Sequence, residues 1–329
     1  MPERPCQGWW SPKTSGNSTR SDEEPKVCGG ELCKMKTEIG MNMRIRKGML
    51  LSVLTLLILM VSACVTKPVQ TVRQGIVPSV DGSPIAYGVQ GRGEPTIVFV
   101  HCWTCNHQFW KDQIKHFSQT HRVLWVDLAG HGESGSHRDR YTMSAFGEDV
   151  AAAVNAAEAD KVILVGHSMG GAVVVEAAKR LGNRVVGIVG VDTFFTPFQY
   201  PKDQDSINAF VKPFESDFHG TSEKLLRSMF APGVDPRQID RIVGMFSGTD
   251  PKVGISAMYE LFQWNAEHAD EDLARYAGIL YNINAAPTGK ETAPNDHVVM
   301  VPGVGHFIAQ VKPQVFNHAL EEIISKLAQ

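Results

Sequence analysis

The 329-residue sequence has no marked excess of charge of either sign. Its 32 lysine and arginine residues are balanced by 35 aspartate and glutamate residues, which leaves a formal net charge of −3. No basic stripe alternates with aromatic residues in the globular part, so we expect no nucleic-acid partner. A hydrophobic content of 43% excludes wholesale disorder, and the length suffices for one large α/β domain.

Cysteine is also scarce. Of the six cysteines, three precede residue 44, one ends an apolar segment and two belong to the expected folded part: Cys6, Cys28, Cys33, Cys64, Cys102 and Cys105. The last two are spaced C-x-x-C, but four metal ligands are not available around them, so we expect no metal site. In an oxidising compartment this pair has the spacing for a disulfide, and a thioredoxin-like redox role is a weaker alternative.

The apolar run from Met49 to Val61 is short for a bilayer span. It follows basic residues and precedes small ones within residues 44–64, which is the order of an export signal. The end of this segment, Val61-Ser62-Ala63-Cys64, resembles the lipobox of bacterial lipoproteins. That resemblance implies lipidation of Cys64 and an exported protein anchored to a membrane of the cell envelope. An uncut signal anchor and a plain export signal are the alternatives.

Residues 1–43 are polar and show no periodicity. Because an export signal normally opens a chain, we interpret them as a doubtful extension and expect translation to start at Met41 or Met43. Residues 65–74 have the character of a linker. The folded domain is expected over residues 75–329.

Strand and helix patterns alternate along this domain. A hairpin signal at Asp81-Gly82 comes first. Continuous apolar runs typical of buried strands follow at residues 96–101, 122–127, 161–166, 184–191, 278–285 and 297–302. Helical patterns occupy residues 109–117, 144–159, 171–181 and the segment from Pro313 onward, so we expect a mostly parallel, doubly wound sheet. Residues 193–277 are too long and too apolar for a loop and predict a helical cap inserted after the sixth strand.

A nucleophile motif lies between the run at 161–166 and the helix at 171–181. Gly166-His167-Ser168-Met169-Gly170 fits G-x-S-x-G, in the strand-to-helix context that the motif requires. The glycines leave room for a tight turn, and the helix N-terminus offers free N–H groups to a developing negative charge. We therefore expect Ser168 to be a nucleophile.

The candidate general base is His306, in Gly303-Val304-Gly305-His306-Phe307. It follows the last expected strand and comes after the serine in the chain, as this arrangement demands. A histidine flanked by glycine in a loop is free to approach a nucleophile and accept its proton.

The motifs together resemble the α/β-hydrolase superfamily of esterases, lipases and haloperoxidases. They occur in the expected order over residues 75–329: V-H-C-W, D-L-A-G-H-G-E-S-G, G-H-S-M-G, V-G-V-D and G-V-G-H-F. Families with an aspartate nucleophile are disfavoured because Ser168 holds that position. The resemblance implies oxyanion N–H donors at Met169 and Trp103 and no cofactor. Cys102 stands where most relatives have glycine.

The sequence offers three candidates for the acid that would complete a catalytic triad with Ser168 and His306. The usual position, after the strand at 278–285, holds no carboxylate. Some members of the superfamily use the end of the preceding strand, where this chain has Asp192, so we expect Asp192 to be the acid. Glu291 and Asp296 are the alternatives, although Asp296 precedes its strand.

These residues predict a serine hydrolase that cleaves a small-molecule carboxylic ester through an acyl-enzyme. Cleavage of a C–C bond, lactone, amide or peptide, or perhydrolysis, would use the same triad. A non-catalytic ligand-binding lipoprotein is disfavoured because Ser168 and His306 are both intact. The sequence leaves the oligomeric state open.

Overall fold

The computed structural model describes residues 72–327, except positions 197, 247, 288 and 290. The expected signal at 44–64, with Cys64, and the segment 1–43 lie outside the described residues. In the part that is described, no helix is both long and apolar enough to cross a membrane.

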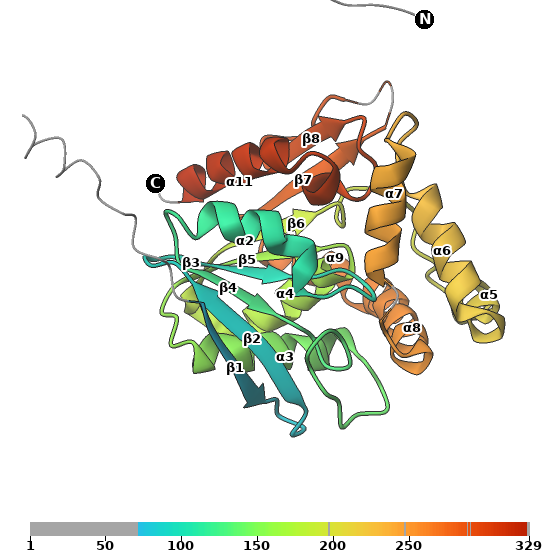
Figure 1. Cartoon of the computed structure of the whole chain (residues 1–329), viewed down its shortest axis with the longest axis horizontal. Helices are drawn as coiled ribbons and strands as arrows, with labels where there is room; N and C mark the ends of the chain where they lie inside the picture. The colour runs from blue at the N-terminus through green and yellow to red at the C-terminus, as the bar shows by residue number, and fades with distance from the viewer. Residues whose placement is uncertain (1–71, 197, 247, 288, 290, 328–329) are drawn as a thin grey trace, which may run out of the picture. The chain divides into compact units, whose positions relative to one another are not determined.

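Within this part the strands form one eight-stranded sheet, in the order β1-β2-β4-β3-β5-β6-β7-β8 (Figure 1). The strands are β1 (Arg73–Pro78), β2 (Pro84–Gln90), β3 (Thr96–Val100), β4 (Val123–Val126), β5 (Val162–His167), β6 (Val185–Val191), β7 (Leu280–Ala286) and β8 (Val298–Pro302). Pairings β1–β2 and β2–β4 are antiparallel and the others are parallel. β1 begins at Arg73, within the expected linker, because Arg73 already pairs with Val89.

Helices cover both faces of the sheet (Figure 1). One layer contains α3 (Met143–Ala156) and α4 (Met169–Leu181), and the other contains α2 (Lys111–Phe117) and α11 (Pro313–Leu327). Successive side chains of β3 point to opposite faces: Val98 joins the core under α3 and α4, and Phe99 joins the core under α2 and α11. A strand buried on both faces must be apolar throughout, which explains the continuous apolar runs. The predicted doubly wound fold is confirmed.

Five α-helices in the described chain lie between β6 and β7: α5 (Gln204–Ser216), α6 (Phe218–Ser228), α7 (Pro236–Val243), α8 (Pro251–Glu267) and α9 (Ala269–Arg275). The first four each begin after an aspartate whose side chain accepts a backbone N–H of the first turn, namely Asp203, Asp217, Asp235 and Asp250. Such caps satisfy N–H groups that a helix leaves unpaired. Capping thus divides this stretch into short helices. We call α5 to α8 the cap.

The loop after β4 is fixed by a buried carboxylate. Asp127 accepts hydrogen bonds from the backbone N–H groups of His107, at 2.7 Å, and Glu133, at 3.0 Å. Within the D-L-A-G-H-G-E-S-G motif, Asp127 therefore holds a structural turn.

Candidate active site

Ser168 lies at the turn between β5 and α4. Its φ of 55° and ψ of −119° place it in a conformation that L-residues rarely adopt. A Cβ at Gly170 would lie 2.7 Å from the carbonyl oxygens of Val100 and His101, and a Cβ at Gly166 would collide with Gly170 itself. The flanking glycines therefore allow the turn that projects the serine side chain.

The two residues expected to donate oxyanion N–H groups are both neighbours of Ser168, one along the chain and one across the pocket. Met169 is the first residue of α4, and an N–H in the first turn of a helix has no partner within that helix. Trp103 follows the end of β3 and lines the same pocket as Ser168. The helix N-terminus adds a partial positive charge at this point.

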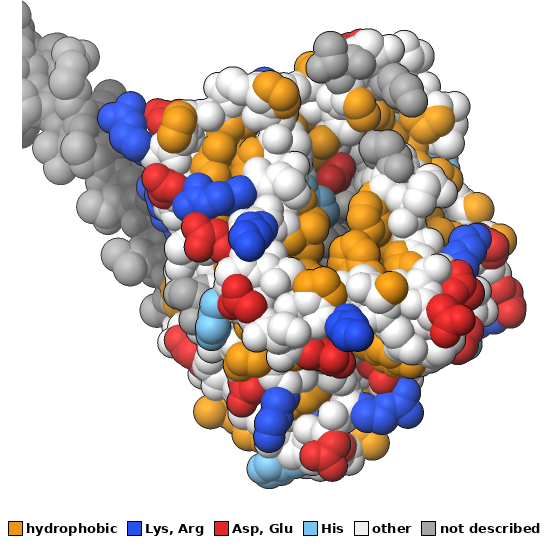
Figure 2. Space-filling model, turned by 90° about the vertical axis from the view of Figure 1, so that its right-hand side faces the viewer, with side chains coloured by type: hydrophobic (Ala, Val, Ile, Leu, Met, Phe, Trp, Pro, Cys, Tyr) orange, Lys and Arg blue, Asp and Glu red, His pale blue; other side chains and the backbone are white. Residues whose placement is uncertain are grey.

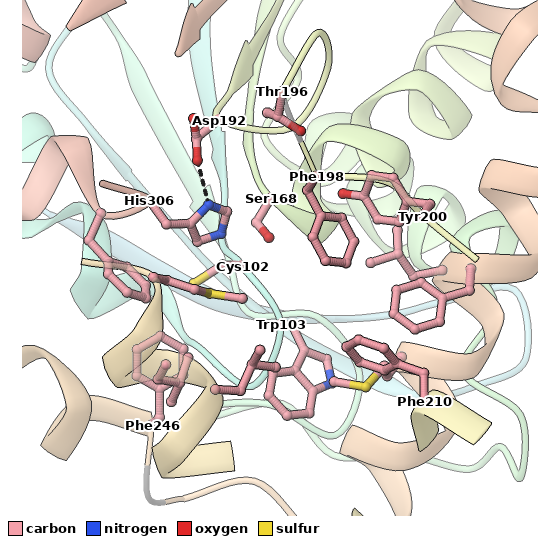
Figure 3. Close-up of a pocket in the computed structure, with 17 residues that line it drawn as sticks. Cys102, Trp103, Ser168, Asp192, Thr196, Phe198, Tyr200, Phe210, Phe246 and His306 are labelled. Atoms are coloured by element: carbon pink, nitrogen blue, oxygen red, sulfur yellow. Dashed lines mark hydrogen bonds and ion pairs between the residues drawn. The ribbon is translucent and has the colours of Figure 1, made fainter. Parts of the chain in front are cut away.

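His306 and Asp192 are hydrogen-bonded to each other. His306 Nδ1 lies 2.6 Å from Asp192 Oδ2, and both side chains are largely buried. Asp192 follows β6 with a φ of 45°. In Figure 3 the imidazole lies between Asp192 and Ser168, and its far side faces the serine. The structure therefore brings together the three residues that the sequence singled out.

The other two candidate acids lie elsewhere. Glu291 is exposed and its carboxylate accepts the N–H of Gly289 at 2.9 Å. Asp296 is exposed at the amino end of β8, whereas His306 follows the carboxyl end of that strand.

The cap contacts the histidine loop through its backbone. His306 donates its N–H to the carbonyl of Met229, at 2.8 Å, and Phe230 forms an isolated antiparallel bridge with Gly305. A Cβ at Gly305 would lie 2.6 Å from the nitrogen of Ala231, so only glycine fits this approach. The segment after α6 thus helps to hold the histidine.

His167, at the end of β5, supports the same loop through a hydrogen bond. Its Nε2 donates to the carbonyl oxygen of His306 at 2.9 Å. Burial, followed by the charge of His306, holds the pKa of His167 well below its usual value. His167 is therefore a neutral donor beneath the loop.

A pocket of about 190 Å³ lies between the cap and the sheet edge. Ser168, Asp192 and His306 line it together with aliphatic and aromatic side chains, among them Phe198, Phe210, Leu225, Met258, Phe262 and Phe307. No lysine, arginine or glutamate is among the described residues that line it. On the face shown in Figure 2, hydrophobic side chains surround a hollow.

Tyr200 is a polar group in this wall that the sequence reasoning missed. Burial, followed by the nearby charge of Asp192, raises the pKa of Tyr200 to about 12. The phenol is therefore protonated and can donate a hydrogen bond. Its position in the irregular segment between β6 and α5 gave no sequence signal.

Trp103 connects the turn after β3 to the cap. Its Nε1 donates to the carbonyl of Gly254 in α8 at 2.7 Å, and its ring packs edge-on against Phe214 and Phe218. The side chain is buried and also lines the pocket. Nearby, Cys102 and Cys105 form a disulfide. Among the described residues, no group of three or more histidine, cysteine or acidic side chains is arranged to hold a metal.

Residues 95–313 match the family model described as the alpha/beta hydrolase fold. The chain belongs to this family. One relative by sequence is the 2-(acetamidomethylene)succinate hydrolase of Mesorhizobium japonicum, 25% identical over 74% of this chain and 94% of that protein. A second is the pimeloyl-[acyl-carrier protein] methyl ester esterase of Edwardsiella ictaluri, 25% identical over 70% of this chain and 94% of that protein.

A solved structure shares the architecture of this α/β-hydrolase. A thermophilic esterase from Thermogutta terrifontis superimposes with a TM-score of 0.65 and 21% identity, over 78% of this chain and all of that one. At this identity the likeness concerns the fold. Together, the family match and the relatives indicate a hydrolase.

Proposed function

We propose that this α/β-hydrolase cleaves carboxylic esters through an acyl-enzyme formed on Ser168. The observation that carries the proposal is the 2.6 Å hydrogen bond between Asp192 and His306, beside a serine on the nucleophile turn. The G-x-S-x-G context and the esterases among its relatives support it further.

The proposed mechanism follows from the proton positions. A carboxylate only accepts, so Asp192 holds the proton of His306 on Nδ1 and leaves Nε2 free to take the proton of Ser168. The serine oxygen then attacks the ester carbonyl. The N–H groups of Met169 and Trp103 stabilise the tetrahedral oxyanion, and His306 returns the proton to the leaving alcohol. Water hydrolyses the acyl-enzyme by the same route in reverse.

The pocket favours an uncharged, apolar substrate. Its wall is mainly aliphatic and aromatic, with no lysine or arginine among the described lining residues to pair with a substrate carboxylate. A cavity of about 150 Å³ holds benzene in another protein, so about 190 Å³ suits an aryl group or a short alkyl chain. A dicarboxylate such as the succinate in the name of one relative would find no lysine or arginine among these described residues.

We also propose that the protein is exported and anchored by lipid at Cys64. The signal pattern of residues 44–64 supports this. A disulfide in the folded part agrees with it, because disulfides persist in oxidising compartments.

Covalent labelling tests the proposed nucleophile. A fluorophosphonate probe is expected to modify Ser168 in the purified protein, as mapped by mass spectrometry of the labelled peptide. Ser168→Ala is expected to abolish both labelling and turnover of p-nitrophenyl esters. Labelling that persists in the alanine variant would overturn the assignment.

A further inference from the structure

The turn that carries Trp103 is closed by a covalent bond. The Cys102–Cys105 disulfide spans residues 102–105, directly after His101 and the end of β3. Cys102 also lines the pocket beside Ser168. The bridge therefore lies at the proposed oxyanion site, where the resemblance to relatives leads one to expect a glycine.

The carbonyl group of Cys102 is held from two sides. It accepts a hydrogen bond from His101 Nδ1 at 2.9 Å and another from the backbone N–H of Cys105 at 3.1 Å. That carbonyl and the N–H of Trp103 belong to one planar peptide unit, in which they point in opposite directions. Fixing the Cys102 oxygen therefore fixes the direction of the Trp103 N–H.

The tautomer of His101 allows it to donate the hydrogen bond to the Cys102 carbonyl. Its Nε2 accepts the backbone N–H of Leu128 at 3.1 Å, which leaves the ring proton on Nδ1 for the Cys102 carbonyl. The ring is fully buried, and burial lowers the pKa of His101. A neutral ring with its proton on Nδ1 is thus built into the turn.

The turn also contains a backbone conformation that needs support. Thr104 has a φ of 54°, in the left-handed region that a β-branched residue avoids. Such conformations persist only where the surrounding structure over-determines them. Here Thr104 lies inside the ring that the disulfide closes, and its carbonyl accepts the hydroxyl of Thr249 at 3.3 Å.

We propose that the Cys102–Cys105 disulfide is a positioning element that aims the N–H of Trp103 at the oxyanion, so that opening the bridge lowers the rate of the chemical step. The inference rests on the proposed function, because it assigns Trp103 the oxyanion role. Reduction by a dithiol transfers two electrons and two protons to the bridge: the S–S bond breaks, two thiols form, and the dithiol becomes a cyclic disulfide. Cys102 lies on the pocket wall, which gives a small dithiol a route to it.

The test compares oxidised and reduced protein. After dithiothreitol treatment, with bridge opening verified by alkylation of two thiols, kcat for a p-nitrophenyl ester is expected to fall about 10- to 100-fold, with KM changed by less than about 3-fold. The inhibition constant of an arylboronic acid, whose Ser168 adduct mimics the tetrahedral intermediate, should rise in parallel. Reoxidation should restore both.

The double variant Cys102→Ser/Cys105→Ser is the matched control. This variant cannot form the bridge, so its kcat is expected to be low with and without dithiothreitol. If the wild-type bridge resists reduction, comparing the variant with the oxidised wild type is sufficient to test the proposal. A kcat within about 2-fold of the oxidised protein in this variant, or a change in KM alone, would overturn the proposal. Loss of the folded state by circular dichroism, in both the reduced protein and the variant, would also overturn it, since the bridge would then be a general structural element.

Failure of the proposed function is distinguishable from failure of this inference. If the oxidised protein hydrolyses no ester, the rate of fluorophosphonate labelling at Ser168 replaces kcat, because that reaction also develops charge at the oxyanion site. A labelling rate that is equal with and without the bridge would then refute the positioning role. A missing label would refute the nucleophile itself and, with it, the oxyanion role on which the inference rests.

Discussion

The second carboxylate oxygen of Asp192 accepts the backbone N–H of Ala285 at 2.8 Å, while the first lies 2.6 Å from His306 Nδ1. Ala285 belongs to β7, the strand after which the family resemblance places the acid. The neighbouring strand β6 therefore supplies the carboxylate, and β7 supplies a backbone donor that orients it. This explains how a chain with no carboxylate directly after β7 can still pair its histidine.

Replacing the candidate acids one at a time tests this arrangement. Asp192→Asn is expected to lower kcat by about 10⁴, because the amide favours the wrong tautomer of His306 and cannot stabilise the imidazolium. Glu291→Gln and Asp296→Asn are matched controls that should leave kcat within about 2-fold, since both side chains are exposed and away from the histidine. Steady-state kinetics after a check of folding would decide. A large loss of kcat in Glu291→Gln, together with a wild-type kcat in Asp192→Asn, would show that the acid is Glu291 in the loop after β7.

Gly305 and Gly303 form a second matched pair. Both have positive φ, 70° and 73°, but a Cβ at Gly305 would meet the backbone of residues 229–231, whereas the nearest atom to one at Gly303 is Lys312 Nζ, 3.8 Å away. Gly303→Ala should lower the stability by about 1–2 kcal/mol, because alanine must then adopt the left-handed conformation. Gly305→Ala should cost more and also lower kcat, because it displaces His306. Equal melting temperatures and equal kcat in the two variants would contradict the contact.

The charge of the acyl chain should control turnover. The p-nitrophenyl esters of valerate and of glutarate (its monoester) have acyl chains of equal length, but the second ends in a carboxylate. We expect kcat/KM to be at least about 100-fold higher for valerate, because none of the described residues that line the pocket is a lysine or arginine that could pair with the carboxylate. Leu225→Lys should narrow that ratio by supplying a cation. Equal rates for the two esters in the wild type would show that the acyl chain does not enter this pocket.

Stability should fall on mild acidification. Burial lowers the pKa of His101, of His167 and, to about 3, of His131, each below the 6.5 of an ordinary histidine. The folded state therefore keeps these rings neutral below pH 6.5, while the unfolded state binds protons, so stability is full above pH 6.5 and is lost as the pH falls. If unfolding lets all three rings bind a proton, the free energy of unfolding changes with pH by up to about 4 kcal/mol per pH unit.

Denaturant titrations between pH 7 and 5 measure this slope. His131→Gln should reduce it by about one proton, or about 1.4 kcal/mol per pH unit. A free energy of unfolding that is flat with pH in the wild type would show that these rings are not buried as neutral groups.

The N-terminus can be tested by mass spectrometry of protein from its native membrane fraction. The mature chain is expected to begin at Cys64 with a lipid adduct, and Cys64→Ser should release the protein from membranes. Val65 rather than aspartate follows the cysteine, so in a bacterium with two membranes the outer one is the expected destination. An unmodified, uncleaved N-terminus would contradict this prediction.

Much of the fold was predictable because its signals are local. Buried strands are apolar throughout, and the glycines at 166 and 170 mark the tight turn at Ser168. Asp192 could be proposed as the partner of His306 only from the family resemblance, because some members of the superfamily carry their acid at the end of the strand that corresponds to β6.

Other features of the site left no such signal. The supports from Ala285 and Met229 come from backbone groups, which every residue carries alike, so no sequence pattern marks them. The hydrogen bond from Trp103 to Gly254 depends on how the cap folds over the sheet, which its irregular sequence does not specify.

The bridge between Phe230 and Gly305 has a consequence for transplanting caps between relatives. Because residues 229–231 contact the histidine loop through main-chain atoms, they act as part of the catalytic scaffold although they lie within the inserted segment. A chimera that exchanges α5 to α8 as one block would remove a support of His306 along with the old substrate walls. A chimera that keeps this short stretch and exchanges the helices on either side would change selectivity while leaving the base in place.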